Sequence, residues 1–435
     1  MDETPLPATG WRRALPDWPE RRYTVHAGTN LWGDWWRAWP GLVAAGPVMP
    51  ALRAFEAEAA RRCGCRYAVA FGAGRMALHA ALGALALGAG DEVIVPGFTC
   101  AVVPNAMLYR QIRPVWVDIE ARTFNLDPER VEAAITGRTR AIYLQHTFGV
   151  SADAKRLRDI AQRHGLLLIE DAAHSLGASV QGQLHGSLGD VGFFSTDRTK
   201  VINTHLGGCA VTNNPAIAAR LQRAQQQAAV FSPGLQRRIV FSFLSEFALR
   251  DPHVFWLGRP LLGALRRCGM NFSWSDEAMD SLPPAYPYPS QLGAVQARLG
   301  LAQLRGLDNN LQHRRCVAEW LEARIGWYSE TLTASERAEQ SWLRYSFLVR
   351  DRAAFVGRFG SHIDLGIWFP SVIFGREGRE AAVGYAAGRC PVAESVARHI
   401  VNLPTHRRIP LARLVSLWRR HGDWLQAQLL PPPQR

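Results

Sequence analysis

Two residues near the middle of the chain could together do chemistry on an amine. Lys200 is one of only two lysines among the 50 lysines and arginines, and it ends the run Phe193-Phe194-Ser195-Thr196-Asp197-Arg198-Thr199-Lys200. Arginine stays protonated, whereas a desolvated lysine can lose its proton and form an imine with a carbonyl group. Upstream, Asp171 closes the apolar run Leu166–Glu170. A lysine imine and a carboxylate for a pyridinium nitrogen are what pyridoxal phosphate (PLP) chemistry requires of a protein.

On residue type alone, an ordinary surface lysine is the simpler interpretation, so the surrounding elements have to decide. Short apolar strands alternate with helices from about residue 50. The predicted strands are Tyr67–Phe71, Glu92–Val95, Val115–Ile119, Ala141–Gln145 and Leu166–Glu170. The predicted helices are Ala51–Arg62, one from the glycine turn at Gly72–Arg75 through Leu87, one beginning at Asp127-Pro128, and Asp153–His164. This alternation predicts an α/β fold with a mostly parallel sheet sandwiched by helices. Ligands of such sheets bind beyond the carboxyl ends of strands, where Asp171 falls.

The chain divides into three segments. Residues 1–48 are rich in Trp, Pro and Gly without a clear period, and we interpret them as an arm on the domain surface. Residues 49–305 are predicted to form the large domain and residues 306–435 a smaller C-terminal α+β domain. The predicted elements of the latter are a strand at Arg344–Val349 and helices at Asp308–Ile325, Asp351–Phe359, Pro391–Ile400 and Leu411–His421.

The composition is that of a folded globular protein, with 48% hydrophobic and 20% charged residues. A formal charge of +13 suits an anionic ligand such as a nucleotide, or an acidic surface, or simply an arginine-rich proteome. No known nucleic-acid module accompanies this charge, so no nucleic-acid partner is expected. The seven cysteines include one close pair, Cys63 and Cys65, without a second pair, which predicts free thiols and no metal site. The sequence shows neither the regions of a signal peptide nor an apolar stretch of membrane-spanning length, and we expect a cytoplasmic protein.

An insert at about residues 231–274 stands apart from the alternating pattern. It places apolar and aromatic runs between arginines such as Arg237-Arg238 and Arg266-Arg267. Helices buried at a domain or subunit interface are the ordinary explanation, because apolar helices usually belong to a core. The alternative is a basic, aromatic helix that lies in a membrane interface.

The motifs around the lysine and the aspartate are specific enough to indicate a family. Glu170-Asp171-Ala172-Ala173-His174, followed by Gly189-Asp190-Val191-Gly192-Phe193-Phe194-Ser195, four residues and Lys200, resembles the DegT/DnrJ-type sugar aminotransferases. These are PLP enzymes of the aspartate-aminotransferase fold (fold type I). The resemblance covers about residues 50 to 410, and its further motifs, in the family's order, are Gly90–Pro96, Val117–Ile119, His146–Gly149, Gly207–Asn213, Gln296–Leu304, Pro391–Glu394 and Asn402–Pro404.

The resemblance implies roles for three catalytic residues. Lys200 would hold PLP as an internal imine and, once displaced by the amino donor, would move the proton between substrate and cofactor. Asp171 would pair with the pyridinium nitrogen and keep it protonated. His174 matches a Gln/His position beside the cofactor ring, although a helix-packing histidine is the alternative.

The resemblance also implies which residues surround the rest of the cofactor. Ser195 would donate its hydroxyl to the phosphate. Gly74, Arg75 and Met76 would offer backbone N–H groups to the same phosphate at a helix N-terminus. The residue that stacks on the pyridine ring is usually aromatic in the family, but Cys100 stands there.

Three further positions depart from the family pattern. The Gly-Glu-Gly-Gly run appears as His205-Leu206-Gly207-Gly208, and Thr196-Asp197 stands where aromatic residues are common. The Asn-Tyr-Arg run, whose Asn reaches the phosphate of the neighbouring subunit, aligns with Pro289-Ser290-Gln291. These changes leave the lysine and the aspartate intact and alter the walls of the site, so they bear on the substrate more than on PLP.

The resemblance predicts a homodimer that transfers an amino group from an amino acid such as glutamate to a keto-sugar. We expect that sugar to be nucleotide-linked and to serve bacterial glycan or antibiotic-sugar assembly. A sugar dehydration is one alternative, although the family's dehydratases carry His where Lys200 stands. The other is a non-catalytic, membrane-peripheral assembly protein that retains the fold. The sugar, its nucleotide and the carbon that is aminated stay open.

Overall fold

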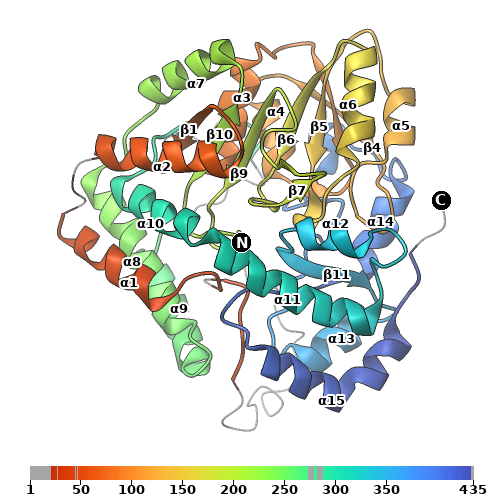
Figure 1. Cartoon of the computed structure of the whole chain (residues 1–435). Coiled ribbons are helices and arrows are strands. Elements are labelled where there is room, and N and C mark those ends of the chain that lie inside the picture. The colour runs from red at the N-terminus through yellow and green to blue at the C-terminus, as the bar shows by residue number, and fades with distance from the viewer. Residues whose placement is uncertain are drawn as a thin grey trace.

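The computed structural model describes residues 21–432 apart from 27, 45, 47, 273–278 and 282–287. A seven-stranded sheet forms the centre of the molecule. Its strands are β1 Tyr67–Phe71, β2 Glu92–Pro96, β4 Arg113–Val117, β5 Thr139–Gln145, β6 Leu167–Asp171, β9 Val191–Ser195 and β10 Gly208–Thr212. They lie in the order β1-β10-β9-β6-β5-β2-β4 (Figure 1). Strand β10 is antiparallel to both of its neighbours, and the other neighbouring pairs are parallel. The predicted α/β fold with a mostly parallel sheet is confirmed.

Helices cover both faces of this sheet, and its strands are therefore apolar on both sides. In β2, Val93 and Val95 pack into one hydrophobic cluster, whereas Ile94 between them packs into another. The helices between residues 48 and 305, apart from those of the insert, are α2 Val48–Arg62, α3 Gly74–Ala84, α4 Val102–Leu108, α5 Pro128–Ala133, α6 Ala154–Arg163, α7 Pro215–Gln227 and α10 Ala294–Arg305.

Two aspartates begin helices as the sequence indicates, and a third shifts a strand. The side chains of Asp127 and Asp153 accept backbone N–H groups of the first turns of α5 and α6. The strand predicted at Val115–Ile119 begins and ends two residues earlier, as β4. Asp118 lies past its end because its carboxylate accepts the N–H groups of Val392 and Ala393, both at 2.9 Å. A contact far along the chain thus fixes this boundary.

The chain after α10 forms a smaller group of helices with a two-stranded sheet. Its antiparallel strands are β11 Arg344–Leu348 and β13 Ile400–Pro404. Its helices are α11 Leu307–Ile325, α12 Ala334–Glu339, α13 Arg352–Phe359, α14 Pro391–His399 and α15 Leu411–Gln428. Ile400 therefore begins a strand instead of ending a helix, and the last helix continues beyond the predicted end at His421. The division of the chain at residues 305 and 306 stays a prediction, and it falls between α10 and α11.

A short parallel ladder connects the C-terminal part to the large one. Strand β12, Ile373–Phe374, pairs with β3, Thr99–Cys100, which follows the carboxyl end of β2. The C-terminal part thereby reaches the carboxyl ends of the parallel strands, where Asp171 also lies at the end of β6.

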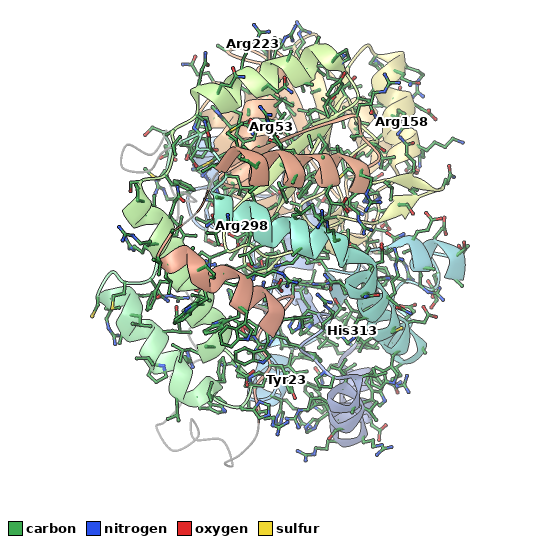
Figure 2. The ribbon with its side chains drawn as sticks, turned by 60° about the vertical axis from the view of Figure 1, so that its left-hand side comes forward. Tyr23, Arg53, Arg158, Arg223, Arg298 and His313 are labelled. Atoms are coloured by element: carbon green, nitrogen blue, oxygen red, sulfur yellow. The ribbon has the colours of Figure 1, made fainter. Side chains whose placement is uncertain are left out.

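Residues 31–44 and 230–272 pack together and are called the accessory layer below (Figure 1, Figure 2). The first segment contains α1 Trp32–Ala38 and the 3-10 turn η2 Trp39–Leu42, and the second contains α8 Pro233–Leu249 and α9 Phe255–Arg267. Ala38 packs with Val240, Phe243 and Leu244 of α8 and with α10. The buried face of the insert thus lies against its own chain. In the part of the chain that the structure describes, no helix has both the length and the apolar character to cross a bilayer.

Candidate active site

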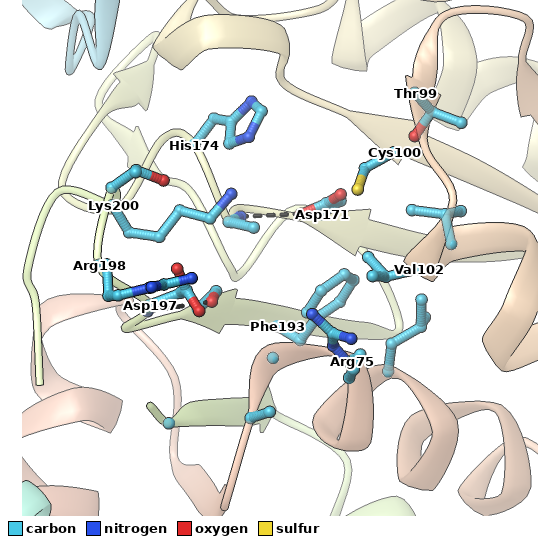
Figure 3. Close-up of a pocket in the computed structure, with 18 of the residues that line it drawn as sticks. Arg75, Thr99, Cys100, Val102, Asp171, His174, Phe193, Asp197, Arg198 and Lys200 are labelled. Atoms are coloured by element: carbon cyan, nitrogen blue, oxygen red, sulfur yellow. Dashed lines mark hydrogen bonds between the residues drawn. The ribbon is translucent and has the colours of Figure 1, made fainter. Parts of the chain in front are cut away.

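A pocket opens where β6 and β9 end and α3 begins (Figure 3). Seven of the predicted site residues line it: Gly74, Arg75, Cys100, Asp171, His174, Ser195 and Lys200. Met76 does not line it, because its sulfur is turned toward Ser290, whose N–H and hydroxyl lie at 3.3 and 3.2 Å from it. The structure therefore brings residues from four separate stretches of sequence to one place.

Lys200 follows a turn after β9, and its side chain extends across the pocket toward the end of β6 (Figure 3). Its Nζ lies 4.8 Å from the centre of the Trp368 ring. Burial lowers the pKa of Lys200, while negative groups nearby, Asp197 first among them, oppose that shift. A larger share of the amine is therefore unprotonated than in an exposed lysine, which is the form that attacks a carbonyl group.

Asp171 is held at the end of β6 by two donors. The hydroxyl of Tyr143 donates to its Oδ2 at 2.6 Å, and the N–H of Ala173 donates to Oδ1 at 2.8 Å. Burial raises the pKa of Asp171, and the hydrogen bonds from Tyr143 and Ala173 oppose this. The carboxylate is thus oriented before a ligand binds. Sequence reasoning missed Tyr143, which lies within the predicted strand Ala141–Gln145.

The neighbouring residue, Glu170, points to the other face of the strand and anchors a loop. Its carboxylate accepts the N–H groups of Gly186 at 2.6 Å and Leu188 at 2.7 Å. Glu170, His146 and His185 lie close enough together to hold a metal ion. However, His146 Nδ1 accepts the N–H of Ala152, so the neutral ring carries its proton on Nε2, 3.2 Å from Glu170 Oε1. A metal ion would need a lone pair on Nε2, but that atom carries the proton and donates to Glu170, so the cluster instead supports the end of β6.

His174 lies in a stack of rings beside the pocket. Its ring is nearly parallel to Phe148, and its centroid lies 5.4 Å from that of Trp368. Nδ1 accepts the N–H of Phe148 at 3.2 Å. Burial lowers the pKa of His174 well below its usual value, with the charge of Lys200 adding to the effect. The histidine is therefore neutral and carries its proton on Nε2.

The start of α3 and the end of β9 form a close-fitting concave surface. A Cβ atom on Gly74 would lie 2.7 Å from the Cβ and 3.0 Å from the Oγ of Ser195. Only glycine therefore lets the first turn of α3 approach the serine hydroxyl. The N–H of Met76 donates to Ala73 O at 3.1 Å, so the first two residues of the helix, Gly74 and Arg75, are the ones that face an anion here. A phosphate group fits this combination of a helix N-terminus and a hydroxyl.

We expect Gly74→Ala to weaken PLP binding by about tenfold or more, because the added methyl group separates α3 from Ser195. The measurement is a titration of the apoprotein with PLP, followed by absorbance. Gly88→Ala is the matched control, since a Cβ there meets nothing within 4 Å. Unchanged affinity in Gly74→Ala would show that the phosphate does not bind at the start of α3.

Aromatic residues from the C-terminal part close the pocket on the side of Cys100. Phe374 lies on β12, which pairs with the strand that carries Cys100, and Trp368 and Phe369 lie just before it. Gln145 fixes the position of that strand, because its side-chain oxygen accepts a hydrogen bond from the hydroxyl of Thr99 at 2.6 Å. The sequence did not indicate these three aromatic residues, because they belong to a segment without a periodic pattern.

The other positions that depart from the family pattern serve packing or line the pocket. Thr196 is buried and shares a hydrogen bond with Thr204 at 2.6 Å. His205 lines the pocket with a φ of 73°, and burial lowers its pKa to about 4. Ser290 accepts the N–H of Gly72 through its carbonyl oxygen at 2.8 Å. The segment around Pro289 thus braces the turn before α3 of its own chain.

The insert also reaches the pocket. Arg198 lines it and donates to Glu246 of α8 at 3.1 Å, and Phe272 lines it from beyond α9. Glu246 is buried and accepts a second arginine, Arg266, at 3.2 Å. The accessory layer is therefore part of the wall of the site.

Comparison with known proteins identifies the family. The model of the DegT/DnrJ/EryC1/StrS aminotransferase family matches residues 46–415. GDP-perosamine synthase of Caulobacter vibrioides is 35% identical over 272 residues, which are 62% of this chain and 61% of that protein. The UDP-N-acetyl-3-dehydro-α-D-glucosamine 3-aminotransferase of Acidithiobacillus ferrooxidans is 31% identical over 385 residues, 85% of this chain and 89% of that protein. The chain thus spans less than two thirds of the first of these relatives.

Solved structures share the fold at lower identity. A DegT DnrJ EryC1 StrS aminotransferase from Brucella abortus superposes with a TM-score of 0.67 at 22% identity, over 91% of this chain and 96% of that one. The GDP-4-keto-6-deoxy-D-mannose-3-dehydratase of E. coli, solved with bound hydrated PLP, gives 0.68 at 20% identity, over 94% and 100%. The match across residues 46–415 and the second relative decide the matter: this chain belongs to the DegT/DnrJ/EryC1/StrS aminotransferase family, whose members depend on PLP.

Proposed function

We propose that this protein is a PLP-dependent aminotransferase that moves an amino group from an amino acid, such as glutamate, to a nucleotide-linked keto-sugar. The observation that carries the proposal is the convergence of Lys200, Asp171 and the Gly74–Ser195 contact in one pocket. The relatives support a nucleotide-linked sugar as the acceptor, because two of them are named after GDP- and UDP-linked sugars.

Each part of PLP finds a matching group in the pocket. Lys200 supplies the amine for a covalent link, and Asp171 supplies an oriented carboxylate for the pyridinium nitrogen. Ser195 and the start of α3 receive the phosphate. Cys100 would stand at the ring where the family usually has an aromatic side chain, and His174, which stacks with Trp368, would border the ring. When bound, PLP supplies an electron sink that makes the substrate's C–H bond acidic.

The chain's own groups would handle the proton and the substrate. Lys200, once released from its covalent link, would be the base that moves the proton, and the lowering of its pKa by burial favours the unprotonated form that this task needs. Trp368 lies against the lysine and limits the positions of its amine. Arg75 brings positive charge to the pocket, which suits a carboxylate on the donor or a diphosphate on the acceptor, whereas the charge of Arg198 is paired with Glu246.

Two alternatives have less support. The fold is shared with a sugar dehydratase, so the fold alone does not separate dehydration from amino transfer. The dehydratases of this family carry His at the position of Lys200, and the lysine therefore favours amino transfer. A non-catalytic assembly protein would have no need for an oriented carboxylate and an amine of lowered pKa in the same pocket.

The proposal includes a homodimer that works in the cytoplasm, in the assembly of a bacterial glycan or a secondary-metabolite sugar. Its support is the family resemblance. Sedimentation velocity of the holoprotein tests the dimer, because a monomer at micromolar concentration would contradict it.

The two half-reactions can be tested separately. Holoprotein is first mixed with glutamate, glutamine or aspartate, and we expect the visible absorption of the bound cofactor to disappear with one of them. GDP-, UDP- and dTDP-linked keto-sugars are then added in turn, and one should restore the absorption and give an amino sugar detectable by mass spectrometry. If a donor removes the absorption but none of these keto-sugars restores it, the nucleotide-linked sugar is contradicted. If no donor changes the cofactor, amino transfer is contradicted.

A further inference from the structure

Exposed apolar side chains are concentrated on the accessory layer. Twelve large hydrophobic side chains are exposed among the residues that the structure describes, and ten belong to residues 31–44 and 230–272. They are Leu31, Trp32, Trp36, Trp39, Val43, Val230, Val254, Leu257, Leu261 and Met270. Single exposed apolar residues are ordinary on a protein surface, whereas a cluster of this kind marks an interaction site.

Helical spacing gathers these side chains into two stripes. Trp32, Trp36, Trp39 and Val43 follow one another at intervals of three or four along α1 and η2, so they share the outward face. Val254, Leu257 and Leu261 are spaced in the same way at the start of α9.

Packing between the helices joins the two stripes to one side of the molecule. Trp32 contacts Phe247 of α8 with ring centroids 5.0 Å apart, and the indole N–H of Trp35 donates to the carbonyl oxygen of Leu244 in the same helix. The guanidinium group of Arg22, before α1, lies over the ring of Phe255 in α9. In both views α1, α8 and α9 lie together at one side of the molecule (Figure 1, Figure 2).

The charges of the accessory layer have one sign at its surface. Among its described residues, the exposed side chains with a formal charge are all arginines: Arg37, Arg237, Arg238 and Arg267. Its acidic residues are turned inward: Asp34 and Glu246 are buried, and Asp251 pairs with Arg408 at 2.8 Å. Exposed tryptophans beside arginines are the combination that suits the interface of an anionic bilayer, because indole rings prefer the headgroup region and guanidinium groups bind phosphate.

We propose that the accessory layer docks this protein on the surface of an anionic phospholipid membrane, with Trp36 and Leu257 at the level of the headgroups and the arginines on lipid phosphates. A second copy of the chain fits the same surface less well. A symmetric dimer would place two patches with the same positive charge against each other, with no exposed acidic side chain in the described part of the layer to offset it. The proposal does not depend on the reaction, since it concerns the exposed side chains of the layer and not Phe272, which lines the pocket.

Vesicle binding by the PLP-loaded protein tests this docking. We expect co-sedimentation with vesicles of phosphatidylcholine and phosphatidylglycerol at low salt, little with phosphatidylcholine alone, and release as salt is added. Arg237→Glu with Arg238→Glu should weaken binding by at least roughly 25-fold, since each basic residue near an anionic surface contributes about fivefold.

The apolar contribution is tested with the double variant Trp36→Ala and Leu257→Ala, whose side chains are 64% and 68% exposed. Its vesicle affinity should fall by at least roughly tenfold while its PLP affinity, measured by absorbance titration, stays unchanged. Leu411→Ala, an exposed leucine outside the layer, is the control and should bind vesicles like the unchanged protein. Absence of binding to anionic vesicles at low salt would overturn the proposal. So would a self-association in sedimentation velocity that the double variant abolishes, because the layer would then be a contact between copies.

Discussion

Replacement of Lys200 by alanine is expected to abolish amino transfer, with a loss of roughly 10⁴-fold or more, because the same side chain makes the covalent link and moves the proton. The visible absorption that the unchanged protein gains with PLP should be missing from Lys200→Ala. Borohydride reduction followed by peptide mass spectrometry should attach the cofactor to Lys200 in the unchanged protein only. Both readouts report on the covalent link without any sugar substrate.

The chain supplies its own matched control, because its only other lysine is Lys155, exposed on α6. Lys155→Ala should keep both the absorption and the borohydride label. Lys200→Arg keeps the positive charge over Trp368 and should still lose both, since a guanidinium group does not form the link. A Lys200→Ala protein that kept the absorption would show that another amine holds the cofactor, and the proposed site would be wrong.

Five of the seven strands of the central sheet could be predicted from the sequence, because they are short apolar runs bounded by turns, whereas β9 and β10 were not predicted as strands. Tyr67–Phe71 has the same bounds in the structure, and the other predicted strands of the sheet lie within two residues of the observed ones. Helix α1 could not be predicted, since its sequence has tryptophans on both its inner and its outer face. Trp35 faces α8, while Trp36 is exposed. Contacts with a segment about two hundred residues away, and not a local period, explain this helix.

The same distinction separates the predicted from the missed residues of the site. Asp171 stands at a strand end and Lys200 in a turn after another strand, where residue type and setting indicate chemistry, whereas Ser195 is indicated by the family motif. Trp368 reaches the lysine only because the two-residue strand β12 pairs with β3. A strand of two residues has no pattern of its own, so nothing local predicts that contact. The backbone N–H of Met76 was expected at the phosphate, and in this structure it donates to the carbonyl oxygen of Ala73 at 3.1 Å.

The second large effect is expected from Asp171→Asn. The amide has nearly the shape of the carboxylate. Its one oxygen can still accept the N–H of Ala173 while its NH2 group donates to the hydroxyl oxygen of Tyr143, but it carries no negative charge to keep a pyridinium nitrogen protonated. The electron sink would be weakened, and we expect kcat for the first half-reaction to fall by roughly a thousandfold, about 4 kcal/mol in the barrier. The protein should still bind PLP covalently, because Lys200 and the phosphate cradle are unchanged.

Two further variants locate the cause of that loss. Asp190→Asn alters an aspartate whose carboxylate accepts the N–H of Leu168 at 2.8 Å, near the other end of β6, and it should change stability more than the rate. Tyr143→Phe removes the donor that orients Asp171 and lowers the pKa of that carboxyl group. In Tyr143→Phe the pKa of Asp171 should therefore rise. The acid side of the pH–rate profile should then move to higher pH, with a rate loss of roughly tenfold. If Asp171→Asn retained most of the rate while Tyr143→Phe did not, the hydroxyl and not the carboxylate would be the group that meets the ring nitrogen.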